Sequence, residues 1–421
     1  MSKNITIFLF LIIAYLAGPA CCSAQEVLAW QDCLKEAKTN NPEYLAALEN
    51  IEQAKAEKKL VISNLLPQIT AEVTAKTSKS GSSDASDAYS YGLSGRQLIF
   101  DSFKTSSDIK ASSYNLTAEE YNYAVISSNV RLNLKIAFSS LLRAQELVSL
   151  TEDIALRRRQ NLEMIQLRYE AGREHKGALL TAQADLAEAD FEVAQAKRNL
   201  ALTQRELLFE MGREDIDLIK VTGKFSIKEI DRTKPNFYYL AQITPLLNEL
   251  IAKKEAIRYN VASSKSELFP DVYLSGSLGQ SDSSWPPKED NWAAGVTVSF
   301  PIFEGGSNYT QIAKNESRLR QAEFDERSGR DNVILTLGET WKNLQDAIDN
   351  VSVEKMFLGA AQERAKIAQA QYSNGIINFD DWIIIEDNLV SAKKAYLNVQ
   401  ANLLITEANW VQAKGGTLSY D

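Results

Sequence analysis

The sequence predicts a mainly α-helical protein built from two copies of one unit, each a long helical hairpin carrying two strands. Marked residues recur at a constant spacing of 203 positions along the 421-residue chain. The spacing never changes, so loops and helices have the same length in both copies. Apolar residues also recur every seven positions within each copy. The recurring pairs are Pro42 and Pro245, Leu65 and Leu268, Pro67 and Pro270, Gly92 and Gly295, Phe100 and Phe303, Gly172 and Gly375, and Gly212 and Gly415.

The seven-residue spacing is typical of supercoiled helices that lie side by side. We expect a long helix over about 102–171, a turn, and a returning helix to about 211, repeated after Gly305-Gly306. At about 1.5 Å per residue the first long helix would span about 100 Å. Its apolar row is Leu134, Leu141, Val148, Ala155, Leu162 and Tyr169, and the matching row is Leu337, Leu344, Val351, Leu358, Ala365 and Tyr372.

The chain divides into four parts on this pattern. Residues 1–24 have the basic start, apolar run and small residues of a secretory signal, with a cut before Gln25. Residues 25–212 form the first repeat, 213–241 a linker with mixed short elements, and 242–421 the second repeat. No later segment has about 18 uninterrupted apolar residues, so we expect no transmembrane helix.

Cys21 and Cys22 leave a second processing route open, in which one of them is lipidated. Gly18 or Pro19 then stands where a lipoprotein signal normally has Leu, which weighs against this route. After a cut before Gln25 only Cys33 remains, so no intrachain disulfide is expected.

Composition excludes few classes of protein. The chain is 45% apolar and 24% charged, as folded proteins are. Its net charge of -9 argues against a nucleic-acid partner. The one basic run, Arg157-Arg158-Arg159, fits the solvated face of the long helix.

Four segments of about ten residues alternate between apolar and small polar side chains. They cover about 68–76, 89–99, 271–279 and 291–300. Each is long enough to cross a bilayer when tilted, and the alternation is typical of an outer-membrane barrel. The alternative is a half-buried soluble sheet, which would have nothing to pack against beside such long helices. The expected lipid-facing residues are Tyr91, Leu93, Val272, Leu274, Trp292, Val296 and Val298.

Four strands cannot close a barrel, so several subunits must contribute strands. Two subunits would give eight strands and a filled interior, whereas three would give twelve and leave room for water. The pattern therefore favours a homotrimer in contact with outer-membrane lipid.

Taken together, these features resemble the outer membrane efflux protein family, the TolC-like channel-tunnels. The resemblance covers nearly the whole mature chain and rests on the ordered, duplicated set of Asn41-Pro42, Leu66-Pro67, Phe269-Pro270 and the Tyr169-x-x-Gly172 and Tyr372-x-x-Gly375 tips. It implies a homotrimer in the cell outer membrane, with a β-barrel of twelve strands above a helical tunnel through the periplasm. The implied partners are a periplasmic adaptor protein and an inner-membrane transporter. The implied channel is a passive exit duct for efflux or type I secretion, with no enzymatic activity and no cofactor.

The resemblance also assigns residues at the helical tips. Adaptor docking would involve Gly172, Arg173, Gly375 and Ile376, although glycines there equally fit helix C-caps. Asp381, with Asp380 beside it, matches an inward carboxylate that narrows the periplasmic aperture. Ile377 and Phe379 would add apolar closure. Aspartates in a first helical turn also fit plain helix-dipole partners.

No motif indicates catalysis or metal binding. His175 is the single histidine and lies in a tip turn, and no phosphate loop or nucleophile motif is present. A periplasmic adaptor is the alternative function, but it would have one hairpin and soluble β domains. A soluble coiled-coil scaffold would leave the strands unexplained.

Overall fold

The computed structural model describes residues 26–82, 84–214, 218–226 and 232–419. The signal peptide predicted over residues 1–24, the cut before Gln25 and the possible lipidation of Cys21 or Cys22 lie outside these residues.

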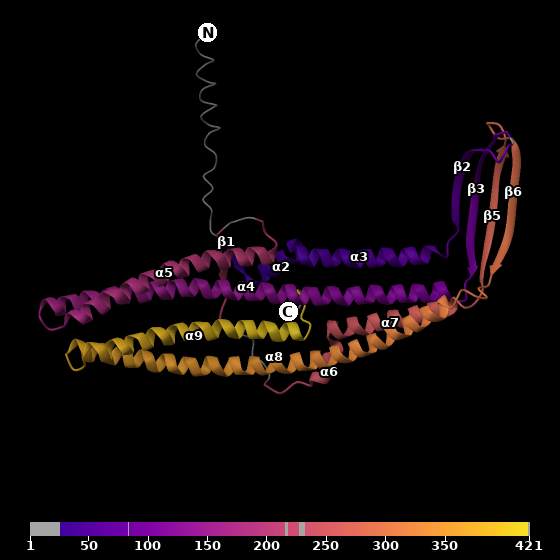
Figure 1. The fold of residues 1–421 in the computed structure, drawn as a ribbon. Helices are drawn as coiled ribbons and strands as arrows, with labels where there is room; N and C mark the ends of the chain where they lie inside the picture. The colour runs from indigo at the N-terminus through magenta and orange to yellow at the C-terminus, as the bar shows by residue number, and fades with distance from the viewer. Residues whose placement is uncertain (1–25, 83, 215–217, 227–231, 420–421) are drawn as a thin grey trace, which may run out of the picture.

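Two helical hairpins lie side by side, with a small sheet at the end opposite their tips (Figure 1). The first hairpin is α4 (Lys104–Glu170) with α5 (Lys176–Met211), and the second is α8 (Ser307–Ser373) with α9 (Phe379–Ala413). α4 and α8 each have 67 residues and start 203 positions apart, so the duplication seen in the sequence is also a duplication of structure.

One further helix in each copy packs against the part of the long helix that the returning helix does not reach. α3 (Pro42–Ser63) packs along α4 beyond the end of α5, and α7 (Pro245–Ser266) packs along α8 beyond the end of α9 (Figure 1). In both copies one long helix therefore lies beside two shorter helices that follow each other along its length. α4 also contacts α7 and α9, and these contacts join the two copies.

The four strands form one antiparallel sheet in the order β2-β3-β5-β6. They are β2 (Gln68–Ser78), β3 (Ser86–Phe100), β5 (Asp271–Asp282) and β6 (Glu289–Ser299), and most extend a few residues beyond the predicted limits. The two copies meet where β3 pairs with β5. Among the described residues, no strand pairs with the outer edges of β2 and β6.

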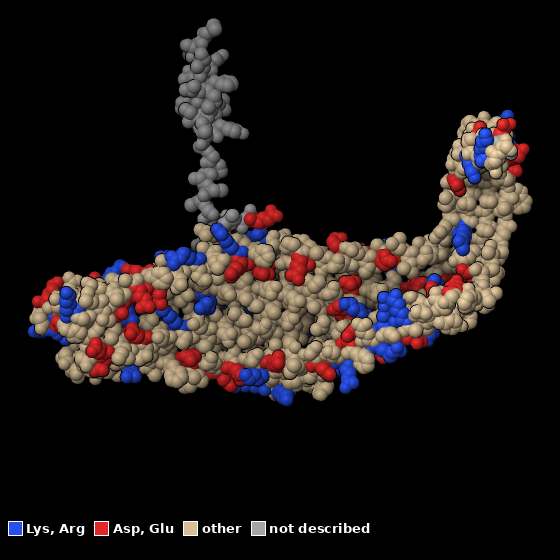
Figure 2. Space-filling model, in the orientation of Figure 1, with Lys and Arg blue, Asp and Glu red and all other residues tan. Residues whose placement is uncertain are grey.

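The strand register decides which side chains share a face of this sheet. Directly paired residues point to the same side, and Leu274 pairs with Val296, Val272 with Val298, and Leu93 with Leu278. All seven residues predicted to contact lipid therefore lie on one face, while serine, threonine and glycine dominate the other. Charged side chains gather at the loop end of the sheet, and the stretch below carries few (Figure 2).

Four short elements were not predicted individually. β1 (Glu26–Ala29) leads into α2 (Trp30–Asn40), and the linker contains β4 (Ile219–Thr222) and α6 (Phe237–Ile243). β1 pairs with β4 in parallel across most of the first repeat. Arg213 joins this group, because its guanidinium bonds both Glu26 and Glu36. These short elements therefore brace the middle of the long rods.

Cys33 lies at the centre of the largest apolar core, beside α4 and α5. Its side chain is 0% exposed and packs in a cluster with Leu134, Leu141 and Leu207. Burial, aided by the nearby carboxylates of Glu36 and Asp32, raises the pKa of the Cys33 thiol to about 12.

Among the described helices, none combines the length and the apolar content that a membrane span needs.

The joints between stacked helices depend on two glycines at matching positions. Gly212 ends α5 with φ 77° and Gly415 follows α9 with φ 81°, a conformation that side chains disfavour. A Cβ on Gly212 would lie 2.3 Å from the carbonyl oxygen of Asn40, and a Cβ on Gly415 would lie 2.3 Å from Cδ of Pro245. Each glycine therefore lets a returning helix end against the start of the next one.

We predict that Gly212→Ala lowers the free energy of unfolding by about 3 kcal/mol, because backbone overlap adds to the conformational penalty. Gly172→Ala is the matched control: its φ is 69°, and no atom lies within 4 Å of the added Cβ. That control should cost only about 1 kcal/mol. Denaturant unfolding followed by circular dichroism measures the free energy of unfolding of both variants. Equal losses would contradict the close contact that Gly212 makes at the joint between the helices.

Candidate functional site

The two helical tips lie at the same end of the molecule, and an aromatic stack organises the second one. The ring of Tyr372, at the end of α8, stacks on Trp382 of α9 with centroids 4.6 Å apart and an interplanar angle of 3°. Phe379 packs edge-on against both rings. Because Tyr372, Phe379 and Trp382 are all buried, the start of α9 is held rigidly against α8.

A polar link ties the first tip to the second. The hydroxyl of Tyr372 donates a hydrogen bond of 2.6 Å to Oε2 of Glu174, and Arg168 lies over the Tyr372 ring at 4.5 Å. Arg168 also donates to the Tyr372 carbonyl oxygen at 3.2 Å. Burial, and then the bond to Glu174, raises the pKa of Tyr372. The sequence reasoning missed Glu174, whose counterpart in the second repeat is Ile377.

Both tip glycines close a helix C-terminus. Gly172 has φ 69° and Gly375 has φ 73°, and the residue after each donates back to the last turn. Arg173 N–H bonds the Arg168 carbonyl at 2.8 Å, and Ile376 N–H bonds the Gln371 carbonyl at 2.9 Å. The capping alternative is thus observed, and it leaves Arg173 and Ile376 exposed at the extreme end.

The predicted aperture residues occupy different environments at the start of α9. Asp380 and Asp381 are exposed in its first turn, where Asn378 caps the helix by accepting from Asp381 N–H at 2.7 Å. Ile377 is half-buried. Phe379 is 4% exposed inside the aromatic stack, so the expectation that it lines an opening does not fit its position in the protomer.

His175 has a structural role in the first tip. Its Nδ1 accepts a hydrogen bond of 3.1 Å from Ala178 N–H and so caps α5. Among the described residues, no group of three or more histidine, cysteine or acidic side chains is arranged to hold a metal ion.

Ion pairs join the hairpins above the tips. Arg157 of α4 bonds both carboxylate oxygens of Glu386 on α9, at 2.6 and 2.7 Å, and Glu386 is 2% exposed. Arg158 donates a single hydrogen bond to Oδ1 of Asp387 on α9. The expectation that this basic run lies on the solvated face was wrong for Arg158, because α9 covers that side of α4.

A family model identifies the family and covers both copies of the duplicated unit. The model of the outer membrane efflux protein family matches residues 33–213 and 239–416, which cover both repeats. The chain therefore belongs to the outer membrane efflux proteins, as the resemblance indicated.

Individual relatives are distant in sequence and close in fold. The cation efflux system protein CusC of Escherichia coli is 21% identical over 91% of this chain and 85% of its own. The alkaline protease secretion protein AprF of Pseudomonas aeruginosa is 23% identical over 68% of this chain and 63% of its own. The crystal structure of the Campylobacter jejuni CmeC outer membrane channel superposes with a TM-score of 0.83 at 18% identity, over 92% of this chain and 86% of that one.

Proposed function

We propose that the protein is the passive outer-membrane exit duct of a tripartite efflux or type I secretion system. In this role it spans the outer membrane with its sheet and the periplasm with its helices. The adaptor alternative is not favoured, because CmeC, whose structure matches 92% of this chain, is an outer membrane channel. Conduction needs a shaped and charged wall and no reacting group.

The observation that carries this proposal is the sheet with two open edges and one apolar face. Val73, Trp292 and Val296 on that face are 71%, 80% and 66% exposed, so they stand largely uncovered by the part of the chain that the structure describes. Lipid would cover them, but unpaired backbone groups at a sheet edge cannot remain in lipid. The edges of β2 and β6 must therefore pair with strands outside the protomer.

Pairing β6 of one copy with β2 of the next closes the sheet without an edge. Three copies give twelve strands, enough to leave a water-filled lumen, whereas two copies give eight and a filled interior. The same three-fold arrangement places α4, α5, α8 and α9 of each copy around one tunnel. We therefore propose a homotrimer.

The exposed tips provide the surface for the partners. We propose that Gly172, Arg173, Gly375 and Ile376 contact a periplasmic adaptor that connects to an inner-membrane transporter. The names of CusC and AprF refer to cation efflux and to protease secretion, so a shared body serves unlike cargo. The transporter would then choose what this channel carries.

The trimer is tested on the mature protein solubilised from membranes. We expect it in the outer-membrane fraction as a heat-resistant species of three protomers by light scattering, and conducting in planar bilayers. A stable, non-conducting monomer would exclude the exit-duct function.

We predict that Val296→Arg impairs barrel assembly, at a cost of roughly 2–4 kcal/mol if the residue lies near the bilayer midplane. Thr297→Arg is the matched control, since it is the next residue on the same exposed strand and points to the polar face. It should assemble and change conductance. Equal assembly defects in membrane fractions would show that the faces are misassigned.

We propose that Asp381, with Asp380, lines the periplasmic constriction, because both are exposed at a rigidly held helix start. Their first-repeat counterparts are Gly177 and Ala178, so each protomer adds charge from one repeat only. A ring of carboxylates concentrates cations. The double variant Asp380→Ala, Asp381→Ala should weaken cation selectivity and abolish block by multivalent cations from the tip side. Unchanged single-channel selectivity and block would leave these aspartates as helix-dipole partners.

A further inference from the structure

The apolar band on the sheet face that contacts lipid in the proposed trimer is shorter than a bilayer requires. On β6 it runs from Trp292 to Val298, which is about 20 Å of strand at about 3.4 Å per residue. At a tilt of about 40° this covers a height of about 15 Å, whereas outer-membrane barrels have a band of about 25 Å. Toward the loops the same face continues with Gln280 and Asp290, which bond each other at 2.7 Å. The missing height is therefore to be found at the foot of the sheet.

Large apolar side chains continue this face where the strands give way to α4 and α8 (Figure 1). Ile302 and Phe303, between β6 and α8, are 88% and 86% exposed. We call the whole set the collar, and it consists of Phe100, Phe103, Phe300, Ile302 and Phe303. The collar lengthens the apolar band toward the helical tips.

Phe103 holds a backbone conformation that a side chain disfavours. Ser102 and Phe103 have φ of 54° and 67°, and Ser102 Oγ donates to the Pro270 carbonyl at 3.0 Å. Their second-repeat counterparts are Gly305 and Gly306, with φ of 65° and 85°. Since glycine makes the same turn in the second repeat, the turn itself does not need the Phe103 ring. A side chain kept in such a conformation points to a function for that side chain.

The Phe103 ring forms one wall of an apolar pocket. The rings of Phe100 and Phe103 meet edge-on with centroids 5.8 Å apart, and Leu65, Ile99 and Ile109 add aliphatic walls. The pocket has a volume of about 380 Å³, which is within the range of ligand pockets. Phe100 pairs with Val272 in the sheet, so the pocket continues the apolar face directly.

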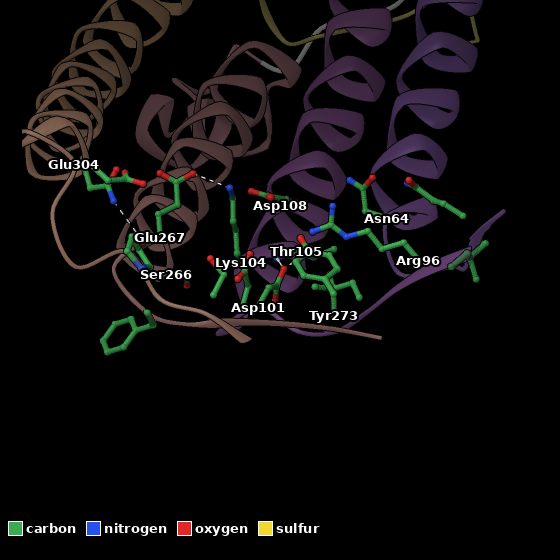
Figure 3. A pocket seen from close by; sticks show the side chains of 18 residues that line it. Asn64, Arg96, Asp101, Lys104, Thr105, Asp108, Ser266, Glu267, Tyr273 and Glu304 are labelled. Atoms are coloured by element: carbon green, nitrogen blue, oxygen red, sulfur yellow. Dashed lines mark hydrogen bonds and ion pairs between the residues drawn. The ribbon is translucent and has the colours of Figure 1, made fainter. Parts of the chain in front are cut away.

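Two charged side chains line this pocket, and they differ in what they are free to bind. Asp101 accepts a hydrogen bond of 2.7 Å from Thr105 N–H, and Figure 3 shows both residues around the polar hollow on the opposite side of the junction. Lys110 is exposed, and its Nζ lies 5.3 Å from the centroid of the Tyr259 ring on α7. Among the residues that the structure describes, no carboxylate lies within ion-pair distance of Lys110. The pocket therefore combines apolar walls with one available ammonium group.

The spacing of Phe103 and Lys110 fits the profile of one membrane leaflet. Phe103 is the N-cap of α4, and the stretch from there to Lys110 spans about 10 Å along the helix axis. Headgroups occupy about 5–7 Å beyond each surface of the hydrocarbon core. Side chains of a helix also lean toward its N-terminus, which for α4 is the sheet side. With the Phe103 ring at the edge of the hydrocarbon, the Lys110 ammonium therefore reaches the phosphate layer.

We propose that the pocket at Phe103 binds a phospholipid of the periplasmic leaflet, with an acyl chain against Phe100 and Phe103 and the phosphate at Lys110. This rests on the proposed function, because it needs the sheet to stand in the outer membrane. The continuity of the pocket with the apolar face and the charge of Lys110 both favour a lipid as the occupant. One such site in each protomer would fix the height at which the barrel sits in the bilayer.

The test measures the lipid retained by the full trimer, which is purified in detergent, titrated with palmitoyl-oleoyl phosphatidylglycerol and examined by native mass spectrometry. Wild type should bind one phospholipid in each protomer. Phe103→Gly should weaken this binding by roughly tenfold, because the acyl chain loses an apolar wall. Glycine suits the local φ, so the variant should unfold at the same temperature as wild type or at a higher one. Lys110→Gln should also weaken binding, and should make it less sensitive to salt.

Phe303→Ala is the matched control. It removes a highly exposed ring from the collar of the second repeat, outside the pocket, and should bind lipid as wild type does.

Four outcomes would overturn the proposal. If Phe103→Gly conducts and binds as much lipid as wild type, the pocket is not a lipid site while the channel function stands. If Phe103→Gly lowers the temperature at which the trimer dissociates and leaves lipid binding unchanged, a neighbouring copy covers the pocket. If Phe303→Ala loses lipid to the same extent, binding reflects apolar surface in general. If wild type forms no trimer in membranes, the exit-duct function fails together with this inference.

Discussion

Backbone hydrogen bonding at the open edges of the sheet constrains the whole molecule. A soluble protein can expose a strand edge to water, but an edge in hydrocarbon has no alternative partner. Once β6 must pair with a neighbouring β2, the protomers have to stand side by side around an axis. The rods attached to the strands must then run parallel to that axis, and the equal lengths of α4 and α8 bring their tips to one level. The tunnel thus follows from closing the barrel.

Most of the fold could be predicted from the sequence because it repeats. The duplicated prolines and glycines mark helix ends and turns, and alternation in the strands assigns Val296 and Thr297 to opposite faces. The register observed for β5 and β6 agrees with that assignment. The short elements β1 and β4 escaped prediction because four-residue strands carry little pattern, and they pair across a long stretch of chain. Arg158 was misplaced because one helix alone does not reveal that a second hairpin covers it.

The candidate sites were harder to derive for the same reason that the fold was easy. A repeat reveals what both copies need for folding, such as Gly212 and Gly415 at the helix joints. The residues that give the ends of the duct their different properties are those at which the two repeats differ. The counterpart of Asp381 in the other repeat is an alanine, and that of Glu174 is an isoleucine. The role of Glu174 follows only from its hydrogen bond with Tyr372, which sequence spacing does not reveal. Phe379 was assigned to the aperture because it is apolar and close to the tip, but its ring is buried against Tyr372 and Trp382.

The constant spacing between the repeats has a consequence for how such proteins can change in length. Removing one residue from α4 would turn every later side chain by about 100° around the helix axis. The buried contacts that α4 makes beyond the deleted residue would be lost together, so a single deletion cannot be absorbed locally. Steps of about seven residues, made in all the long helices at once, preserve the packing. The length of the helical part can therefore evolve only in discrete increments of about 10 Å. The distance between the sheet and the helical tips is thus fixed in steps, and it has to match the width of the compartment that the helices cross.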